Sequence, residues 1–269
     1  MPRIAPWLCL VAPILASAAP SAPTDAGVTW AALPADYLGG WWKSEVEGLR
    51  AARKPQPMSG CLFSERVEWD RGHDSGGASL LDKRRLLLVA DDAQSEAVDK
   101  WEKGRVLVLC YDEARGVTLL DPEGGLRLPV RHVSDRHPIE DYIRSLKAGN
   151  TVQMNAVGIE AIRLWRLEID RSVREVLALP HLPADVRARF IALTKTRLDY
   201  CEQQTRFGAE AIARSYQGGT IIGPLTGEYS GSVYRGAYQD LARLYEQCMS
   251  FGEQTEAEKA GMGEGQSKK

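Results

Sequence analysis

Apolar residues in the second half of the chain recur at steps of three and four, which is the spacing of one face of an α-helix. The first such pattern predicts a helix that begins near Asn155 and ends before Pro180. Its apolar positions are Ile162, Trp165, Ile169, Val173 and Val176.

A second pattern begins at Pro183, a residue suited to a first helical turn, and continues past Gly208 to Tyr216, where Gly218-Gly219 stops it. One face of this helix carries Val186, Phe190, Leu193, Arg197 and Cys201. A third pattern has the same spacing and consists of Tyr234, Tyr238, Leu241, Tyr245 and Cys248. We therefore expect three helices that share one core.

The preceding part of the chain has the short alternating and β-branched runs of strands, with turn signals such as Asp121–Gly125 between them. The runs are 61–69, 84–90, 105–111, 117–121 and 126–132. They predict a small antiparallel sheet.

A helix is expected on each side of this sheet. The one before it covers residues 35–53, and its packing residues are Trp41, Trp42 and Leu49. The one after it has Ser134 or Asp135 as its cap and Gly149 as its terminator. Its first turn contains Pro138, and its inward residues are Tyr142, Ile143 and Leu146.

Two cysteines of the predicted helical hairpin lie at nearly the same depth. Cys201 precedes Tyr216 by 15 residues and Cys248 follows Tyr234 by 14, which is roughly 22 Å and 21 Å of helix from the connecting loop. Helices that pack about 8–10 Å apart allow such residues to reach disulfide distance. We expect a Cys201–Cys248 bond in an oxidising compartment.

The N-terminus has the pattern of a secretory signal peptide. Arg3 gives a positive start, residues 5–15 are apolar but too short to span a bilayer, and Ala16-Ser17-Ala18 fits a cleavage site. We therefore expect a periplasmic or secreted protein with no stable membrane insertion after removal of the signal. Four cysteines remain, Cys61, Cys110, Cys201 and Cys248, and sequence separation favours the pairs 61–110 and 201–248 among three possible connectivities. The alternative is four reduced, buried thiols.

These patterns predict an α+β protein, in which a small disulfide-clamped antiparallel β domain precedes an antiparallel α-helical hairpin or three-helix domain. The expected divisions are a signal peptide (1–18), an N-terminal segment with a helix (19–60), a β-rich domain (61–150), a helical domain (151–252) and a disordered tail (253–269).

Motifs that would carry catalysis are weak, so we predict a protein that is not an enzyme and needs no cofactor or metal. The Asp74–Gly77 stretch resembles the surroundings of a protease serine, but no histidine precedes His73 to act as its base. His132, Asp135 and His137 offer three metal ligands in one loop, although a helix-capping loop fits their spacing better. With 34 basic and 36 acidic residues spread along the chain, nucleic-acid binding has no electrostatic basis.

The runs LPADVRARF, RLDYC and SYQGGTIIGPL in the helical half resemble the LprI-like lysozyme-inhibitor family. That family has a helical hairpin with a basic residue four before a cysteine, and an aromatic-x-Gly-Gly-Ser/Thr loop followed by proline. The matching residues here are Arg197, Cys201, Tyr216, Gly218, Gly219, Thr220 and Pro224. The resemblance covers residues 155–250.

The resemblance implies an exported bacterial envelope protein that binds and blocks a cell-wall hydrolase, lysozyme, through the loop 218–234. The residues expected to contact this protein partner are Tyr216, Gly218, Gly219, Thr220, Ser230, Ser232 and Tyr234. Two alternatives stay open. The loop can be a solvated connector, and the protein can be a non-catalytic structural or adaptor protein that binds a partner through its β domain.

Overall fold

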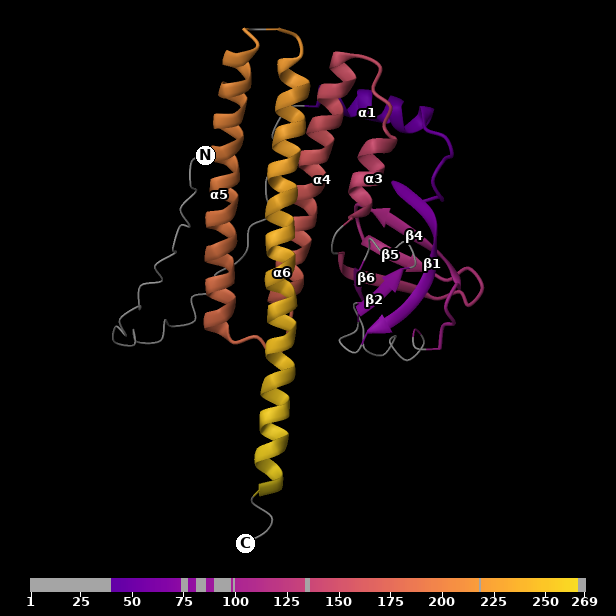
Figure 1. Cartoon of the computed structure of the whole chain (residues 1–269), viewed down its shortest axis with the longest axis vertical. Coiled ribbons are helices and arrows are strands. Elements are labelled where there is room, and N and C mark those ends of the chain that lie inside the picture. The colour runs from indigo at the N-terminus through magenta and orange to yellow at the C-terminus, as the bar shows by residue number, and fades with distance from the viewer. Residues whose placement is uncertain are drawn as a thin grey trace, which may run out of the picture.

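The described part of the protein consists mainly of a small β-barrel and a layer of three long helices, which confirms the predicted α+β class (Figure 1). The computed structural model describes residues 40–73, 77–80, 86–89, 98, 100–133, 136–217 and 219–265. The expected signal peptide, residues 1–18, lies outside these ranges, as does most of the Asp74–Gly77 stretch.

The predicted antiparallel sheet closes into a barrel with the strand order β1-β2-β3-β6-β5-β4. Closure depends on β1, which pairs with β4 along residues 63–68 and with β2 along residues 69–73, where the register shifts between Trp69 and Arg71. A β-bulge of this kind bends a strand so that it can serve two neighbours. The strands are β1 (Phe63–His73), β2 (Gly77–Leu80), β3 (Leu86–Val89), β4 (Val106–Asp112), β5 (Gly116–Leu120) and β6 (Arg127–Val133).

The predicted disulfide between Cys61 and Cys110 is confirmed and connects the segment before β1 to β4. In β4, Leu107, Leu109 and Tyr111 alternate along the strand and are fully buried, because side chains at every second position of a strand share one face. The two cysteines are 49 residues apart. Closing a loop of this length lowers the conformational entropy of the unfolded chain and stabilises the folded state by about 4 kcal/mol.

Two short helices connect the barrel to the helical layer. In α1 (Trp41–Ala52) the buried residues are Trp42, Val46 and Leu49, while Trp41 is exposed, contrary to the prediction. Adjacent residues of a helix point about 100° apart, so Trp41 and Trp42 cannot both face the core.

The helix expected after the sheet is α3 (Pro138–Ser145), with Tyr142 and Leu146 buried and Ile143 partly buried. Its cap is His137, whose Nδ1 atom accepts a hydrogen bond from the Ile139 amide at 3.2 Å. The predicted caps, Ser134 and Asp135, lie outside the described residues.

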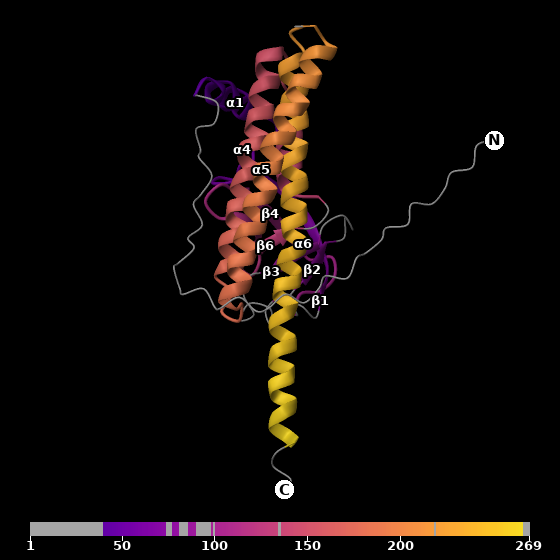
Figure 2. The same cartoon turned by 90° about the vertical axis from the view of Figure 1, so that its left-hand side faces the viewer.

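The three predicted long helices are α4 (Thr151–Leu177), α5 (Ala184–Ser215) and α6 (Ile222–Gly265). Figure 1 shows α6 between α4 and α5, with α4 nearest the barrel, and Figure 2 shows the same helices from the α5 side. All five predicted apolar positions of α4 are buried. In α5, however, Leu193 is exposed, and the buried face consists of Phe190, Ile191, Thr194, Leu198 and Cys201.

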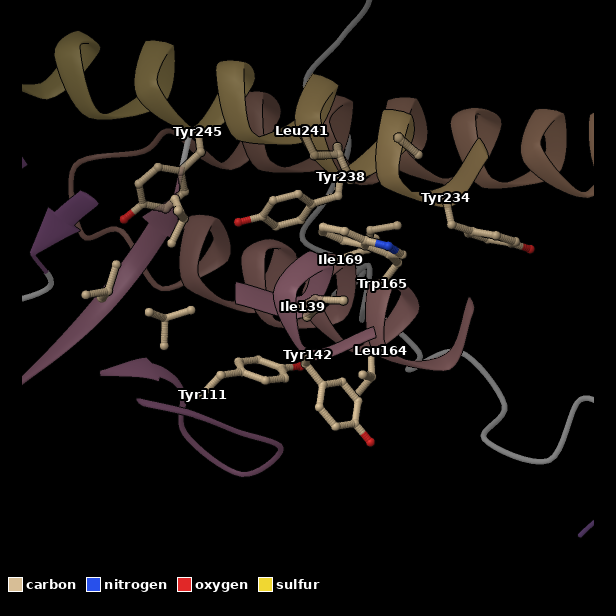
Figure 3. Packing of buried hydrophobic residues seen from close by; sticks show 14 of the residues in the cluster. Tyr111, Ile139, Tyr142, Leu164, Trp165, Ile169, Tyr234, Tyr238, Leu241 and Tyr245 are labelled. Atoms are coloured by element: carbon tan, nitrogen blue, oxygen red, sulfur yellow. The ribbon is translucent and has the colours of Figure 1, made fainter. Parts of the chain in front are cut away.

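Aromatic rings join the barrel to the helices through one continuous core. Tyr111 of β4 contacts His137, which contacts Trp165 of α4, which contacts Tyr238 of α6, with ring centroids between 5.2 and 5.8 Å apart. Figure 3 shows Tyr234, Tyr238 and Tyr245 pointing from α6 toward α4. The core therefore extends across the predicted boundary at residue 150.

The segment expected to be a loop, 218–234, is helical from Ile222 onward, so that prediction is wrong for most of its length. Gly223, Gly227 and Gly231, spaced by four, face α4 rather than a turn. A Cβ atom on Gly158 of α4 would lie 2.7 Å from the Cα atom of Gly227. The glycines therefore permit two helix backbones to approach closely, as small residues four apart do in tightly packed helices.

The early start of α6 also rules out the expected Cys201–Cys248 bond, and both cysteines are free. Arg197 of α5 pairs with Asp240 of α6 at 2.5 Å, which sets the register of this antiparallel pair. Counting from that contact, Cys248 lies beside the level of Arg189, about 12 residues or roughly 18 Å from Cys201 along the axis. This separation far exceeds the reach of a disulfide.

The C-terminal segment expected to be disordered from residue 253 instead continues α6 as far as Gly265. Residues 254–260, QTEAEKA, are mostly good helix formers. Extending an existing helix requires ordering only one residue per added hydrogen bond, so the packed part of α6 can propagate into this segment. Residues 266–269 lie outside the described part of the chain.

The close contact between α4 and α6 predicts opposite effects for two glycine-to-alanine variants. Gly158→Ala would place its methyl group against the Gly227 backbone, and we expect a loss of about 1–3 kcal/mol in the free energy of unfolding. Gly236→Ala meets nothing within 4 Å and should gain about 0.5–1 kcal/mol. Urea unfolding measures both. Equal stability of the two variants would contradict the close helix contact.

Candidate functional site

The residues predicted to contact a partner fall into two separate environments. Tyr216, Gly219 and Thr220 are exposed in the turn that joins α5 to α6. Ser230 and Tyr234 are buried within α6. Ser232 is exposed, but its hydroxyl donates to the Tyr229 carbonyl at 2.6 Å. Gly218 lies outside the described residues. The accessible part of the predicted site therefore consists of the short turn and, separately on α6, Ser232.

Tyr234 contacts residues of its own chain. The Arg166 guanidinium lies 5.6 Å from the centroid of its ring, a distance typical of a cation–π contact. Tyr234 belongs to the row of tyrosines that faces α4 in Figure 3. Ser230, one turn earlier, is almost completely buried. A partner could reach these two side chains only if α6 moved away from α4.

Exposed apolar residues gather at the end of the helical layer that contains this turn. Val152 and Met154 come from the first turn of α4, and Tyr216 and Ile221 come from the α5–α6 turn; between 47% and 50% of each is exposed. The two helix starts lie together, because Asn155 packs against Gly223. Figure 1 shows both at the same end of the molecule. We call Val152, Met154, Tyr216 and Ile221 the tip.

The turn at the tip has a defined hydrogen-bonded structure. The Gly219 amide donates to the Tyr216 carbonyl at 3.1 Å, and the Ile222 amide donates to the Gly219 carbonyl at 3.2 Å. Gln217 adopts a positive φ of 48°, which reverses the chain after α5. Six residues thus connect two packed helices. Because this turn is already ordered, Tyr216 and Ile221 lose little conformational entropy on binding.

A groove of about 480 Å³ begins at Met154 and continues between α3, α4 and α6. Its apolar lining includes Val157, Ala161 and Trp165. Arg235 lies on its rim and pairs with Glu140 at 2.9 Å. The groove has the size and mixed lining of a binding site, and it extends the apolar surface of the tip.

Buried charges lie between the barrel and the helices. Glu160 of α4, which is fully buried, accepts hydrogen bonds from Arg50 at 2.5 Å and from Arg163 at 2.8 Å. Arg163 also forms two bonds of 2.8 Å to Glu113 in the turn after β4. Although burial opposes it, this pairing lowers the pKa of Glu113. The charges satisfy one another, as in a structural ion-pair network.

A second buried cluster contains His137 and Glu168. The His137 Nε2 atom lies 3.7 Å from a Glu168 oxygen, and Arg171 donates to the other Glu168 oxygen at 3.2 Å. Burial raises the pKa of Glu168, but the contacts to His137 and Arg171 outweigh it, and the net pKa is lowered. Both His137 and Glu168 are almost completely buried, so a substrate would have no direct access to them.

The hypothetical metal-ligand set is not assembled within the described part of the chain. His137 uses Nδ1 to cap α3, while Asp135 and the His132 side chain lie outside the described residues. Among the side chains that the structure describes, no group of three or more His, Cys, Asp or Glu is placed to hold a metal ion.

Comparisons with protein-family models, with curated proteins and with solved structures found no match to this chain. Of the helices that the structure describes, none has both the length and the apolar composition required for a membrane span.

The sequence contained signals for the features that the predictions missed. The G-x-x-x-G-x-x-x-G spacing of Gly223, Gly227 and Gly231 has the period of a helix face, although glycine is more typical of loops. Val152 and Met154 lie just before the predicted start of this helix near Asn155, so the helical periodicity was not extended to them. Of the four tip residues, the sequence-based prediction therefore included only Tyr216.

The carboxyl group of Glu175 predicts a measurable pH dependence of stability. Burial and repulsion from Glu168 raise its pKa from the ordinary value of 4.5 to about 8. Its Oε2 atom is buried without a hydrogen-bond partner among the described residues. The folded state therefore favours the protonated form, and this stabilisation is complete below about pH 4.5 and lost as the pH rises to about 8.

Glu175→Gln keeps the side chain neutral at every pH. We expect it to match the wild type near pH 4 and to exceed it by up to about 5 kcal/mol above pH 8 in urea unfolding. Exposed Glu102→Gln is the control and should show no such divergence. A constant difference between Glu175→Gln and the wild type at all pH values would refute this assignment.

Proposed function

We propose that this chain is an exported, non-catalytic protein of the bacterial envelope that binds a protein partner with its tip, and that the partner is a cell-wall hydrolase of the lysozyme type. The observation that carries the proposal is the gathering of four exposed apolar residues at one narrow end of the helical layer. Contiguous exposed apolar patches of this kind mark interaction sites.

The tip has the properties of a protein-binding anchor. Tyrosine is enriched among residues that dominate binding energy, and Tyr216 and Ile221 project from a turn fixed by two packed helices. Lysozymes hold two carboxyl groups in a cleft. An apolar tip with the exposed Thr220 hydroxyl beside it can fill such a cleft and donate a hydrogen bond to one of these acids. The sequence resemblance to lysozyme inhibitors directs the proposal to this partner.

The alternative of an adaptor that binds through the β domain has less support. Each of the six described strands pairs with two neighbours, so these strands leave no open edge to which a partner could add a strand. Among the barrel residues whose exposure the structure describes, exposed apolar side chains do not gather as they do at the tip. Among the described residues around it, Met58 and Val106 are the large apolar side chains with high exposure.

The proposal predicts that tip variants lose binding to lysozyme without losing stability. The double variant Tyr216→Ser/Ile221→Ser removes two exposed anchors, and we expect at least a tenfold weaker Kd, since such anchors contribute about 1–2 kcal/mol each. Isothermal titration against lysozymes of several types, with a parallel cell-wall lysis assay, measures the effect. Met58→Ser, also exposed but located before β1, is the matched control.

Two results would overturn different parts of the proposal. If none of the lysozymes binds the wild type, the hydrolase is not the partner. If a lysozyme binds the double variant as tightly as it binds the wild type, the tip is not the contact surface.

A further inference from the structure

The outer side of α5 carries a second apolar surface, far from the tip for most of its length. Leu193, Tyr200 and Phe207 are 51%, 53% and 72% exposed. They are spaced by seven residues, nearly two helical turns, so they form one stripe along the helix. Figures 1 and 2 show α5 at the edge of the helical layer on the side away from the barrel. We call these three residues the α5 stripe.

The α5 stripe is distinct from the side of α5 that belongs to the core. Thr194, Leu198 and Cys201 face the interior. The end of the stripe at Leu193 leads into a shallow apolar groove of about 250 Å³ between α5 and α6, which includes Leu244 and Cys248. Apolar surface thus continues from the stripe onto α6, and an additional helix could cover both.

Four exposed charges follow the stripe along one flank. In chain order they are Lys195, Asp199, Arg206 and Glu210, so their signs alternate. At about 100° per residue, Glu210, Asp199 and Arg206 lie roughly 80–120° around the helix from the stripe on one side, and Lys195 lies roughly 140° away in the same direction. When the helix is reversed about the midpoint of this charge series, Glu202–Gln203, Lys195 takes the place of Glu210 and Asp199 takes the place of Arg206. The series is therefore complementary to itself in an antiparallel arrangement.

We propose that α5 pairs in antiparallel orientation with α5 of a second copy of this chain, about a two-fold axis near Glu202–Gln203. Asp199 then lies level with Arg206 of the second copy, and Lys195 lies level with Glu210 of the second copy. The same register brings Tyr200 to within roughly 3 Å, along the axis, of Phe207 of the second copy. Two-fold symmetry makes every contact twice, as in other isologous dimers.

Self-complementary charge favours a second copy over an unrelated occupant. An unrelated partner would require some complementary pattern on its own surface, but it would place no constraint on the order of charges within α5. Charged residues that flank an apolar helical seam set the partner and its orientation. The proposal does not depend on the proposed function, because the two surfaces share no residue.

The decisive experiment is a charge reversal with rescue, measured on the full chain by sedimentation equilibrium. We expect the wild type to dimerise, and Asp199→Lys and Arg206→Glu each to weaken the dimer at least tenfold, because each brings like charges together at two symmetric positions. The double variant D199K/R206E should return to within threefold of the wild-type Kd. Residues 199 and 206 are about 10 Å apart along one helix, so this rescue requires contact between copies.

A second pair of variants tests the apolar contact. Phe207→Ser should weaken the dimer at least tenfold, whereas Met58→Ser, outside the helical layer, should leave it unchanged. A wild type that stays monomeric at about 100 μM, well above a Kd typical of specific dimers, would overturn the proposal. So would a dimer that forms equally well in the single charge variants, or single variants that the double exchange fails to rescue.

Discussion

The contact between Gly158 of α4 and Gly227 of α6 is the constraint on which the arrangement of the helices depends. With no side chain on either residue, the two backbones approach more closely than any other pair of residues would allow. This contact requires α6 to be helical by residue 227, and α6 begins at Ile222. The α5–α6 connection is therefore a short turn, and Cys248 is displaced from Cys201 along the helix axis, so that both cysteines are free.

The opposite side of α4 joins the helical layer to the barrel. Glu160 and Glu168 would be costly to bury alone, but arginines of α1 and α4 pair with them. Between these two carboxylates, Trp165 continues the row of rings that connects Tyr111 of the barrel with Tyr238 of α6. The helix α4 thus has a polar and aromatic connection on one side and a close backbone contact on the other.

These contacts leave two apolar surfaces without a neighbour among the described residues. The short turn concentrates exposed residues at the tip, where the starts of α4 and α6 meet. The helix α5 packs mainly on α6, so its outer side carries the α5 stripe into solvent. The same packing that closes the interior therefore determines where partners can bind, at the tip for a proposed protein target and along α5 for a proposed second copy.

The sequence by itself determined the three long helices, their buried faces in α4 and α6, the strand-rich segment and the Cys61–Cys110 bond. Helical periodicity and strand alternation are local properties of the sequence. The strand-rich segment contains two cysteines, Cys61 and Cys110, which favours a disulfide between them. The sequence did not determine the role of Gly223–Gly231 or the closure of the barrel. It also predicted a disulfide for Cys201, which is a free cysteine. Glycine permits both a loop and a close helix contact, and only the neighbouring α4 backbone decides between them. The tip and the α5 stripe likewise required the tertiary structure, because exposure depends on which surfaces other elements cover.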